Sequence, residues 1–474
     1  MPHLCSAFIS SVVDIRLLLQ NLQQIIEDQA AVIAEQAKTI KRLEEKVTSL
    51  EAEVAILRNK KNSNNSSVPP SKDENRPKKN QSLRTKSGRR PGGQPGREGT
   101  TLTCNGVVDE VVKHSADFCS CCGKDMSGTE ETLIATRQVI DIPPIRPATT
   151  AHQVYARQCS CGHKMQGSFP AHITAAVQYG PNVSAMVAYL HARQYLPYDR
   201  LRELIKDGLG LPLSIGGINN ILQRIAQKAT PVYQQIKQRI SQASVIGADE
   251  TGVNIAGKLH WMWVWQNDWL TYLHCSDTRG FKTIEAVFEG GLPKAVLQHD
   301  RYAPHFKTVA RHHQVCTAHL LRDFNYIHEL YDGKCIWPGE FKALIHQSLQ
   351  LKKEMSAEDY TGHNRERQQL YGQLQYLLEL PLEVAFKKAV SLQKKLRKIR
   401  GCILSFLEYP DVPPDNNGSE RAIRNVKVKQ KISGQYRSGA GADTFAILRS
   451  VIDTTIKSGQ NVLNALFNIA LCPG

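Results

Sequence analysis

Three acidic residues stand where a carboxylate could do chemistry. Asp249 lies within an apolar, strand-like run, where an unpaired charge is costly to bury. Asp300 ends a second apolar run, and Glu420 opens a predicted helix. Carboxylates hold hard divalent cations, and two such ions can stabilise the attacking and leaving oxygens when a phosphodiester bond is broken. The three side chains are therefore candidates for a two-metal site.

Each of these acidic residues also has an ordinary explanation. Asp249 and Asp300 could simply end strands or begin turns. Glu420 stands three residues after Asn417, as in a capping box, and four before Arg424, as in an ion pair between successive helical turns. Residue types and spacing alone favour these structural roles, so a catalytic site depends on whether neighbouring elements bring the carboxylates together.

A second group of candidate ligands consists of cysteines. Five of the 12 cysteines form two tight clusters, Cys119/Cys121/Cys122 and Cys159/Cys161. In a long chain without an export signal, such clusters favour metal binding over disulfides and indicate a reducing cytoplasm. Unrelated buried thiols are the alternative.

The elements that would carry the carboxylates are predicted from patterns of apolar residues. Residues 244–255, LHWMWVW and WLTYLHC predict three neighbouring antiparallel strands, and a helix, the strand AVLQHD and a further helix follow. This order predicts a mixed sheet covered by helices over residues 244–332. Residues 333–410 are charged and helical and predict an inserted subdomain. The sheet-covering fold resumes over residues 411–474.

The N-terminal end predicts a coiled coil and a linker. Over residues 15–59, apolar residues recur at every seventh position from Leu19 to Val54. At the offset three further on, Leu recurs as well, interrupted by Gln29 and Gln36. This pattern favours a parallel two-stranded coiled coil over a single helix packed on its own protein. Residues 60–103 are rich in Asn, Ser, Pro, Gly and basic residues, which predicts a disordered linker. Within it, Arg89 and Arg90 suit either a flexible DNA-binding arm or a solvated tether.

Two smaller segments separate this linker from the predicted sheet. Residues 104–170 hold the cysteine clusters among short β-like runs such as TRQVIDI (136–142). Residues 171–243 are predicted to be helical, and within them a helix, a Gly-containing turn and a second helix are compatible with a helix-turn-helix or with any helical hairpin.

The overall charge narrows the class of partner. Lys and Arg number 60 against 44 Asp and Glu, a formal net charge of +16. Such an excess suits a nucleic acid or an anionic membrane surface, although a basic soluble protein is the plain alternative. A membrane-spanning helix is not expected, because no run reaches about 18 uninterrupted apolar residues. The stretch before Arg16 is a poor signal peptide, since it contains no basic residue.

Longer motifs add a resemblance to these patterns. The chain contains, in order, NSNNSSVPPSKD, GRRPGGQPG, the paired cysteine clusters, ADETGV, HDRYAPH, CTAHLLRDF, DNNGSERAIRN and RSGAGADTFAILRSVIDTTIKSGQNV. This ordered set resembles the transposases of the insertion-sequence-66 family over nearly the whole chain. The resemblance implies a ribonuclease-H-like catalytic core with an Asp-Asp-Glu triad, here Asp249, Asp300 and Glu420, that binds two Mg²⁺ or Mn²⁺ ions. That family usually shows Ser-Asp-Gly-Tyr around the second Asp, whereas this chain has His299 and Arg301.

The resemblance also implies a function and its partners. A transposase binds the terminal repeats of its transposon and catalyses metal-dependent strand cleavage and strand transfer. Its partners would be double-stranded DNA of the transposon ends and target, a second copy through the coiled coil, and accessory proteins encoded by the element. The expected location is the bacterial cytoplasm, at the nucleoid and not at a membrane. The alternative is a zinc-containing, coiled-coil DNA-binding regulator or an inactive, domesticated transposase.

The same resemblance extends to a zinc site and to DNA contacts. FCSCCG resembles the family's zinc knuckle, with Ser120 in place of Pro, and QCSCG resembles its second half. Structural Zn²⁺ would then be held by Cys119, Cys122, Cys159 and Cys161. Cys316 and His319 would pack in the core or position DNA. Basic residues that could bind phosphate oxygens are Arg322, Arg421, Arg424, Lys427 and Arg437, and Lys429 and Lys431 would extend them into a basic track. Together the segments predict a multidomain α/β protein.

Overall fold

The computed structural model describes residues 3–59, 61–62, 64–66, 73, 96, 98, 102–104 and 106–472, with the side chains of 3–16 and 52 excluded. Most of the predicted linker, Arg89 and Arg90 included, lies outside the described residues. The chain divides into two compact units. Unit 1 consists of Met1–Pro77, Phe169–Leu201 and Ile215–Gly474, and unit 2 of Lys78–Ser168 and Arg202–Ser214. Among the helices described, none has the length and apolarity needed to cross a membrane.

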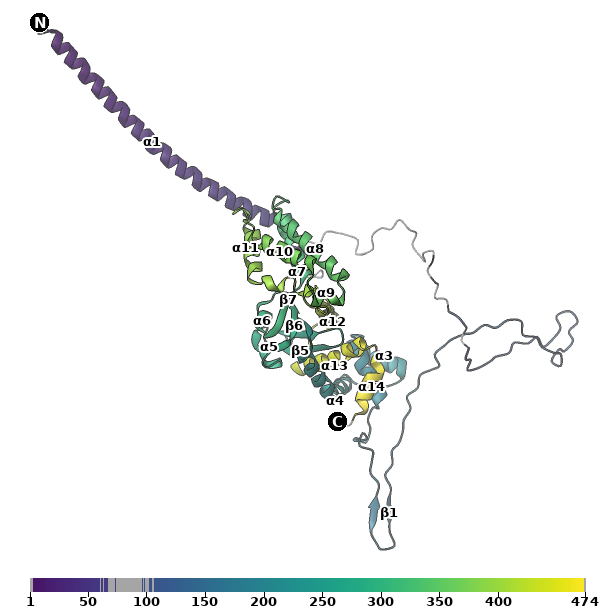
Figure 1. Cartoon of the computed structure of the whole chain (residues 1–474). Helices are drawn as coiled ribbons and strands as arrows, with labels where there is room; N and C mark the ends of the chain where they lie inside the picture. Colours follow the sequence, from purple (N-terminus) through teal and green to yellow (C-terminus); the bar gives the residue numbers. More distant parts are fainter. Residues whose placement is uncertain are drawn as a thin grey trace. The chain divides into compact units, whose positions relative to one another are not determined.

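A long N-terminal helix precedes the globular part of unit 1. Helix α1 (His3–Arg58) is 56 residues long and contains neither Pro nor Gly, the residues that most disfavour a helix interior (Figure 1). The apolar residues Ile26, Ile33 and Ile40 repeat along it and are 64%, 65% and 57% exposed in this single chain. The predicted long helix is therefore confirmed, and burial of its apolar residues requires a partner.

A five-stranded mixed sheet lies at the centre of unit 1, with the strand order β5-β4-β3-β6-β7. The strands β3, β4 and β5 pair antiparallel, whereas β3, β6 and β7 pair in parallel. Their bounds are β3 (Val245–Ile255), β4 (Lys258–Gln266), β5 (Thr271–Ser276), β6 (Leu292–His299) and β7 (Ala310–Val315). The prediction of a mixed sheet with helices is confirmed.

Alternation along the strands gives the sheet two buried faces. Ile246 and Ala248 of β3 lie with Trp263 and Trp265 of β4 in a core completed by helices α4 (Ile215–Ser241) and α5 (Phe281–Val287). On the other face, Val253 packs in a second core with residues of α12 (Asn417–Ser433) and α13 (Gly439–Lys457). Asp249 shares the alternation of Val253, and Glu250 shares that of Ala248. The two acidic neighbours therefore belong to opposite faces.

Helices follow the last strand and form a third core. Leu320 and Phe324 of α7 (Thr317–Leu330) pack there with Trp337 and Phe341 of α8 (Trp337–Glu354). The stretch predicted as a helical insertion contains the remaining helices of this part, which are α9 (Ala357–Thr361), α10 (Arg365–Glu379), α11 (Lys387–Lys398), η2 (Arg400–Cys402) and η3 (Ser405–Leu407). Figure 1 shows these helices grouped beside β7, away from β5.

The helical stretch before the sheet has the order that its sequence predicts. Its elements are α2 (Pro181–Ala188), the π-helical turn η1 (Tyr189–Arg193), α3 (Tyr198–Leu209) and α4. Residues 210–214 separate α3 from α4, and Gly210 supplies a left-handed conformation there, with φ of +66°. Helix α14 (Val462–Leu471) ends the described chain.

Unit 2 contains little regular structure. Its described strands are β1 (Ala156–Gln158) and β2 (Lys164–Gln166), which pair antiparallel as a hairpin. The run TRQVIDI, expected to be β-like, is not a strand. Val139 within it is 92% exposed, so no apolar contact offsets the cost of ordering an extended segment.

Candidate active site

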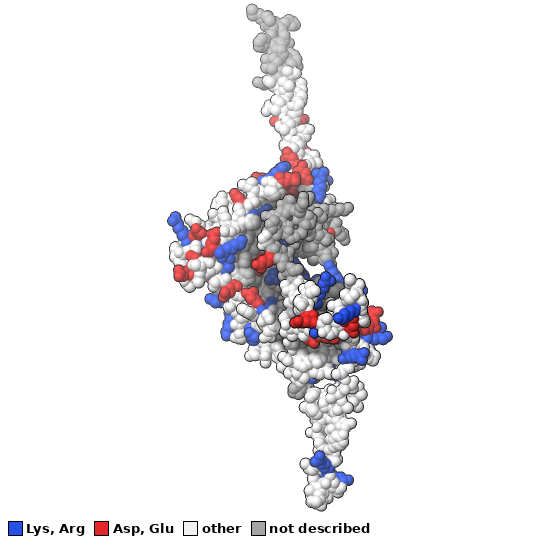
Figure 2. All heavy atoms as spheres, turned by 90° about the vertical axis from the view of Figure 1, so that its right-hand side faces the viewer, with Lys and Arg blue, Asp and Glu red and all other residues white. Residues whose placement is uncertain are grey.

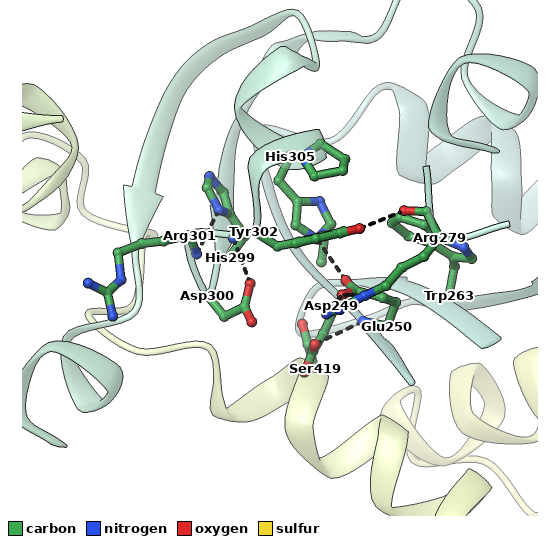
Figure 3. A network of polar contacts seen from close by, with 12 residues as sticks. Asp249, Glu250, Trp263, Arg279, His299, Asp300, Arg301, Tyr302, His305 and Ser419 are labelled. Carbon is green, nitrogen blue, oxygen red and sulfur yellow. Dashed lines mark hydrogen bonds and ion pairs between the residues drawn. The ribbon is translucent and has the colours of Figure 1, made fainter. Parts of the chain in front are cut away.

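Asp249 and Asp300 lie just beyond the point where their two strands stop pairing. β3 and β6 pair through three residue pairs, the last of which joins Gly247 to Gln298. Asp249 and Asp300 each follow that pair by two residues, so they continue the same register. Figure 3 shows the two aspartates near each other, with Ser419 of α12 beside them.

Glu420 reaches the same edge because α12 begins directly against β3. Gly247 leaves no room for a side chain, since a Cβ there would lie 2.8 Å from Oδ1 of Asn416. Asn416 precedes α12 and donates from Nδ2 to the carbonyl oxygen of Ala248 at 2.8 Å. Its own carbonyl accepts the backbone N–H of Glu420 at 3.2 Å. The helix that carries Glu420 therefore starts against the strand that carries Asp249.

The charges of these carboxylates act on one another. The pKa of Asp249 is raised well above its ordinary value, chiefly because burial penalises the charged form. The negative charges of Asp300 and Glu250 are the next causes, and Glu420 adds a smaller effect in the same direction. The metal-free protein thus holds Asp249 in an environment that disfavours its ionised form.

The donor set is of the kind that a divalent cation requires. Carboxylate oxygens are the preferred ligands of Mg²⁺, and a cation would relieve the mutual repulsion. In the described part of the chain, no group of three or more His, Cys, Asp or Glu side chains is arranged so that it could hold a metal ion. Each carboxylate has a protein partner. Asp249 Oδ1 accepts the N–H of Glu250 at 2.8 Å, Asp300 Oδ1 accepts the N–H of Tyr302 at 2.9 Å, and Glu420 Oε1 lies 4.0 Å from Nη2 of Arg322. The three carboxylates therefore suit such ions by residue type, but they are not gathered into a ready ligand set.

A fully paired acidic group, Glu250, lies on the opposite face of β3 from Asp249. Its side chain is inaccessible to solvent. Its Oε1 accepts Nε and Nη2 of Arg279 at 2.9 and 2.6 Å, and its Oε2 lies 3.1 Å from Nε2 of His305 (Figure 3). The guanidinium of Arg279 also lies over two aromatic rings, with its Cζ 4.6 Å from the centroid of Trp261 and 4.0 Å from that of Tyr302.

The residue after Asp300 adopts a backbone conformation that L side chains rarely adopt. Arg301 has a φ of +77°. Its N–H donates to Nδ1 of His299 at 3.1 Å, and its Nη2 lies 2.5 Å from Oδ2 of Asp323. The glycine usual at this position in the resembled family adopts such a conformation without strain. In this chain the surrounding contacts hold an arginine there instead.

The basic residues expected to bind DNA differ in how exposed they are and in whether they bind other groups of the protein. Arg421, Arg424 and Arg437 are exposed, and the side chain of Arg322 is 30% exposed. Lys427 donates from Nζ to the carbonyl oxygen of Gly252 at 2.9 Å.

The predicted basic track is wrong at its centre. Lys429 is 8% exposed, and burial lowers its pKa to about 8, because α12 turns this position toward the protein. On the coloured part of the face in Figure 2, acidic and basic side chains are interspersed.

Each cysteine cluster forms its own tight turn in unit 2. The N–H groups of Gly123 and Gly162 donate to the carbonyls of Cys119 and Cys159, both at 2.9 Å. Backbone N–H groups lower the pKa of both thiols, with that of Cys122 the largest cause for Cys119 and that of Cys161 for Cys159. Across the described residues, the cysteines are not gathered into one group able to hold an ion.

Several residues of the site carry no distinctive sequence signal. Glu250, Arg279 and His305 come from three separate elements, and only folding brings them together. The available hint was Glu250 itself, an acidic residue next to Asp249 in an apolar run, since such a residue needs partners when it is buried. Cys316 is fully buried, and its Sγ accepts the N–H of Asn416 at 3.2 Å, which accords with core packing.

Comparisons with known proteins give a consistent result. Residues 176–444 match a family described as Transposase IS66 family. Residues 15–103 match a family of unknown function, DUF6444. The chain is also 25% identical over 393 residues to the uncharacterized protein y4jD of Sinorhizobium fredii, an alignment that covers 74% of this chain and 73% of that protein.

Proposed function

Because the chain belongs to the IS66 family of transposases, we propose that it cuts and joins DNA strands with the carboxylates of Asp249, Asp300 and Glu420. The observation that supports this proposal most directly is the contact between β3, which carries Asp249, and the start of α12, which carries Glu420. The three residues are far apart in sequence and come from β3, the end of β6 and α12. A purely structural set of carboxylates has no reason to converge at the cost of mutual repulsion.

The proposed ligands of two divalent cations, Mg²⁺ or Mn²⁺, are these three side chains. When bound, such ions supply charge stabilisation at the scissile phosphate and lower the pKa of an attacking water. Asp249 and Asp300 would face each other across the two strands, and Glu420 would complete the site from the first turn of α12. The strand order β5-β4-β3-β6-β7 supports a ribonuclease-H-like assignment of this domain.

The role of the surrounding basic groups is to orient DNA. Arg322 lies beside Glu420, and Arg421 and Arg424 lie on the exposed side of α12. Guanidinium groups bind phosphate oxygens in a fixed geometry, so these three side chains would align the backbone with the carboxylates. Hydrolysis at the transposon end would free a 3′-hydroxyl, which then attacks a phosphate of the target DNA.

The remaining parts of the chain would bind the transposon ends and pair the subunits. Helix α1 would form a coiled coil with a second copy, and Arg89 and Arg90 would lie along the DNA backbone. Two cysteine turns, each of which favours thiolates, support a structural Zn²⁺ site made of Cys119, Cys122, Cys159 and Cys161. The α3–α4 segment would contact the terminal repeats, and accessory proteins of the element could join the complex.

The test is strand cleavage by the purified chain. Labelled duplexes that carry the ends of the encoding element are incubated with Mg²⁺ or Mn²⁺ and with EDTA. We expect metal-dependent nicks at the element's ends, which Asp249→Asn and Glu420→Gln each abolish. Glu383→Gln, a matched change of an exposed Glu outside the site, should cleave like the unaltered chain.

The opposite result would identify a DNA-binding regulator. Such a protein binds the same duplexes, leaves them intact with either metal, and is unaffected by Asp249→Asn. Binding measured by electrophoretic mobility shift in the same samples separates this outcome from a preparation that has lost its fold.

A further inference from the structure

We propose that Glu250, Arg279 and His305 form a positioning cross-link that sets the spacing between Asp249 and Asp300. This inference rests on the proposed function, because spacing matters only if the two aspartates bind cations together. None of the three residues needs to touch DNA or an ion. They act through the backbone segments that carry the aspartates.

A cross-link is needed because the backbone pairing of β3 with β6 does not extend to the two aspartates. The last backbone pair between β3 and β6 joins Gly247 to Gln298, two residues before each aspartate. The β3–β6 pairing ends at that pair, and Asp300 lies after the end of β6. Side-chain contacts must therefore supply the restraint that a continued ladder would give.

The contacts run continuously from one aspartate to the other. Glu250 is adjacent to Asp249 on β3, and it binds Nε2 of His305 at 3.1 Å on α6 (Ala303–Lys307), five residues after Asp300. The path closes through Tyr302, whose Oη donates to the carbonyl oxygen of Arg279 at 3.2 Å. The N–H of Tyr302 donates to Oδ1 of Asp300 itself at 2.9 Å.

The network is built to resist movement. The side chains of Glu250 and His305 are both inaccessible to solvent, so water does not compete for their hydrogen bonds. Arg279 is restrained by two N–H groups that donate to one carboxylate oxygen and by contacts of its guanidinium with two aromatic rings. Trp263 anchors the same loop by donating from Nε1 to the carbonyl oxygen of Thr278 at 3.3 Å.

The alternation of β3 explains why this network is separate from the site. Asp249 belongs to the face of α12, and Glu250 belongs to the face of α4 and α5. The cross-link therefore lies on the face of β3 opposite Asp249, and its three side chains do not occupy the face to which Asp249 belongs. In Figure 3, Arg279 and His305 lie on the side of Glu250 away from Ser419.

The test compares two largely buried carboxylates, each of which is paired with an arginine. In Glu250→Gln the carboxylate that accepts Nε and Nη2 of Arg279 becomes an amide. In the control, Asp453→Asn, the carboxylate that accepts Nε and Nη2 of Arg449 at 3.0 and 2.5 Å on α13 becomes an amide. Mn²⁺ binding to each full-length protein is measured by titration calorimetry without DNA. Three further quantities are measured on the same proteins: the Mn²⁺ dependence of cleavage, the affinity for duplex DNA and the melting temperature.

We expect Glu250→Gln to raise the Mn²⁺ dissociation constant by about tenfold or more, as loss of a group that orients metal ligands does. Asp453→Asn should lower the melting temperature without this change, and duplex affinity should stay constant in both. Arg279→Lys is the second variant. The Arg279 side chain is 40% exposed, so the fold tolerates the change. The variant loses the paired hydrogen bonds from Nε and Nη2 to Glu250 and the contact of the guanidinium with the two aromatic rings. It should weaken Mn²⁺ binding in the same direction.

Two results would overturn the inference, and they differ from each other. If the unaltered chain binds Mn²⁺ and cleaves DNA while Glu250→Gln and Arg279→Lys bind Mn²⁺ as tightly as Asp453→Asn, the network is only structural. If the unaltered chain neither binds Mn²⁺ nor cleaves DNA, the proposed function itself fails. The calorimetry distinguishes the two without relying on activity.

Discussion

At the scale of single residues, the surroundings of Asp249 and Asp300 impose local costs on the fold. Asp249 carries a charge that burial and neighbouring carboxylates disfavour. Arg301 holds a left-handed backbone conformation directly after Asp300. Strain and like charges of this kind persist only where the surrounding structure over-determines them, and they concentrate at functional sites. The effect of each on stability can be measured with a variant that removes the charge or the backbone strain.

Asp249→Asn should stabilise the metal-free protein. The folded-state pKa of Asp249 lies above its unfolded value, so the unfolded state binds fewer protons between the two values and stability falls as pH rises through that window. The variant does not lose stability in this way, because its amide does not ionise. Its melting temperature in EDTA should exceed that of the unaltered chain by a margin that grows with pH from the ordinary pKa of Asp upward.

Mn²⁺ should reverse the order of the melting temperatures of Asp249→Asn and the unaltered chain. Mn²⁺ stabilises a protein that binds it in the folded state, so the unaltered chain should gain melting temperature and Asp249→Asn should not. Thermal unfolding with and without Mn²⁺ checks both parts. Equal melting temperatures for the two proteins in EDTA at neutral pH would contradict the electrostatic account.

Arg301→Gly and Arg301→Ala separate backbone strain from the ion pair with Asp323. Both variants lose the ion pair. The left-handed conformation remains unfavourable for alanine, whereas glycine adopts it without strain. We expect the glycine variant to be the more stable by about 1 kcal/mol in urea unfolding. A more stable alanine variant would mean that the backbone at this position relaxes when the arginine is removed.

At the scale of elements, the contact between β3 and α12 decides where Glu420 lies. The contact is close because Gly247 has no side chain, and Asn416 uses the space to reach the backbone of β3. The helix and the strand are therefore coupled, so a change in β3 should displace Glu420, a proposed catalytic residue that lies far away in sequence.

Gly247→Ala tests this coupling, and Gly252→Ala on the same strand is its control. At Gly247 a Cβ would lie 2.6 Å from Oγ of Ser419, whereas at Gly252 the nearest atom is the flexible end of Leu259 at 3.0 Å. We expect Gly247→Ala to cost about 1–3 kcal/mol of stability and most of the cleavage activity, because α12 must move away. Gly252→Ala should cost less than about 1 kcal/mol.

Chemical denaturation and cleavage assays on the two variants decide the matter. Full activity in Gly247→Ala would show that the start of α12 can shift without moving Glu420. Equal losses in both variants would indicate a general intolerance of β3 to side chains, with no specific role for the contact.

At the scale of the whole molecule, α1 leaves its apolar residues exposed in a single chain. Ile33 is 65% exposed and belongs to the seven-residue repeat, so it should become buried when two chains pair. A transposase that must act on two DNA ends benefits from such pairing. The proposed dimer therefore links the longest helix of the chain to its function.

Ile33→Lys should weaken the dimer, and Ala31→Lys is the matched control on the opposite side of α1. A lysine in the seam removes roughly 2 kcal/mol of apolar burial per chain and brings like charges together. Sedimentation equilibrium should show more monomer for Ile33→Lys at a given concentration and no change for Ala31→Lys. An unaltered chain that is already monomeric at micromolar concentration would refute the coiled-coil proposal.

Local pattern predicted many of the elements of this chain but not all of them. The heptad repeat predicted the long helix, and alternation predicted β3, β4 and β5, because each periodicity depends only on which face of an element is buried. The same alternation placed Asp249 and Glu250 on opposite faces. Local pattern failed for TRQVIDI, where no neighbouring strand completes the pairing, and for Lys429, whose burial depends on how α12 packs.

The tertiary structure alone decided which residues meet. The β3–β6 register brings Asp249 toward Asp300, the absence of a side chain at Gly247 lets α12 carry Glu420 to them, and folding joins Glu250 to Arg279 and His305. Sequence by itself determined the acidic candidates and the segments that carry them. It did not determine their partners, because a pairing register and a helix contact are set by packing between distant segments. Such packing produces no periodic pattern within either segment.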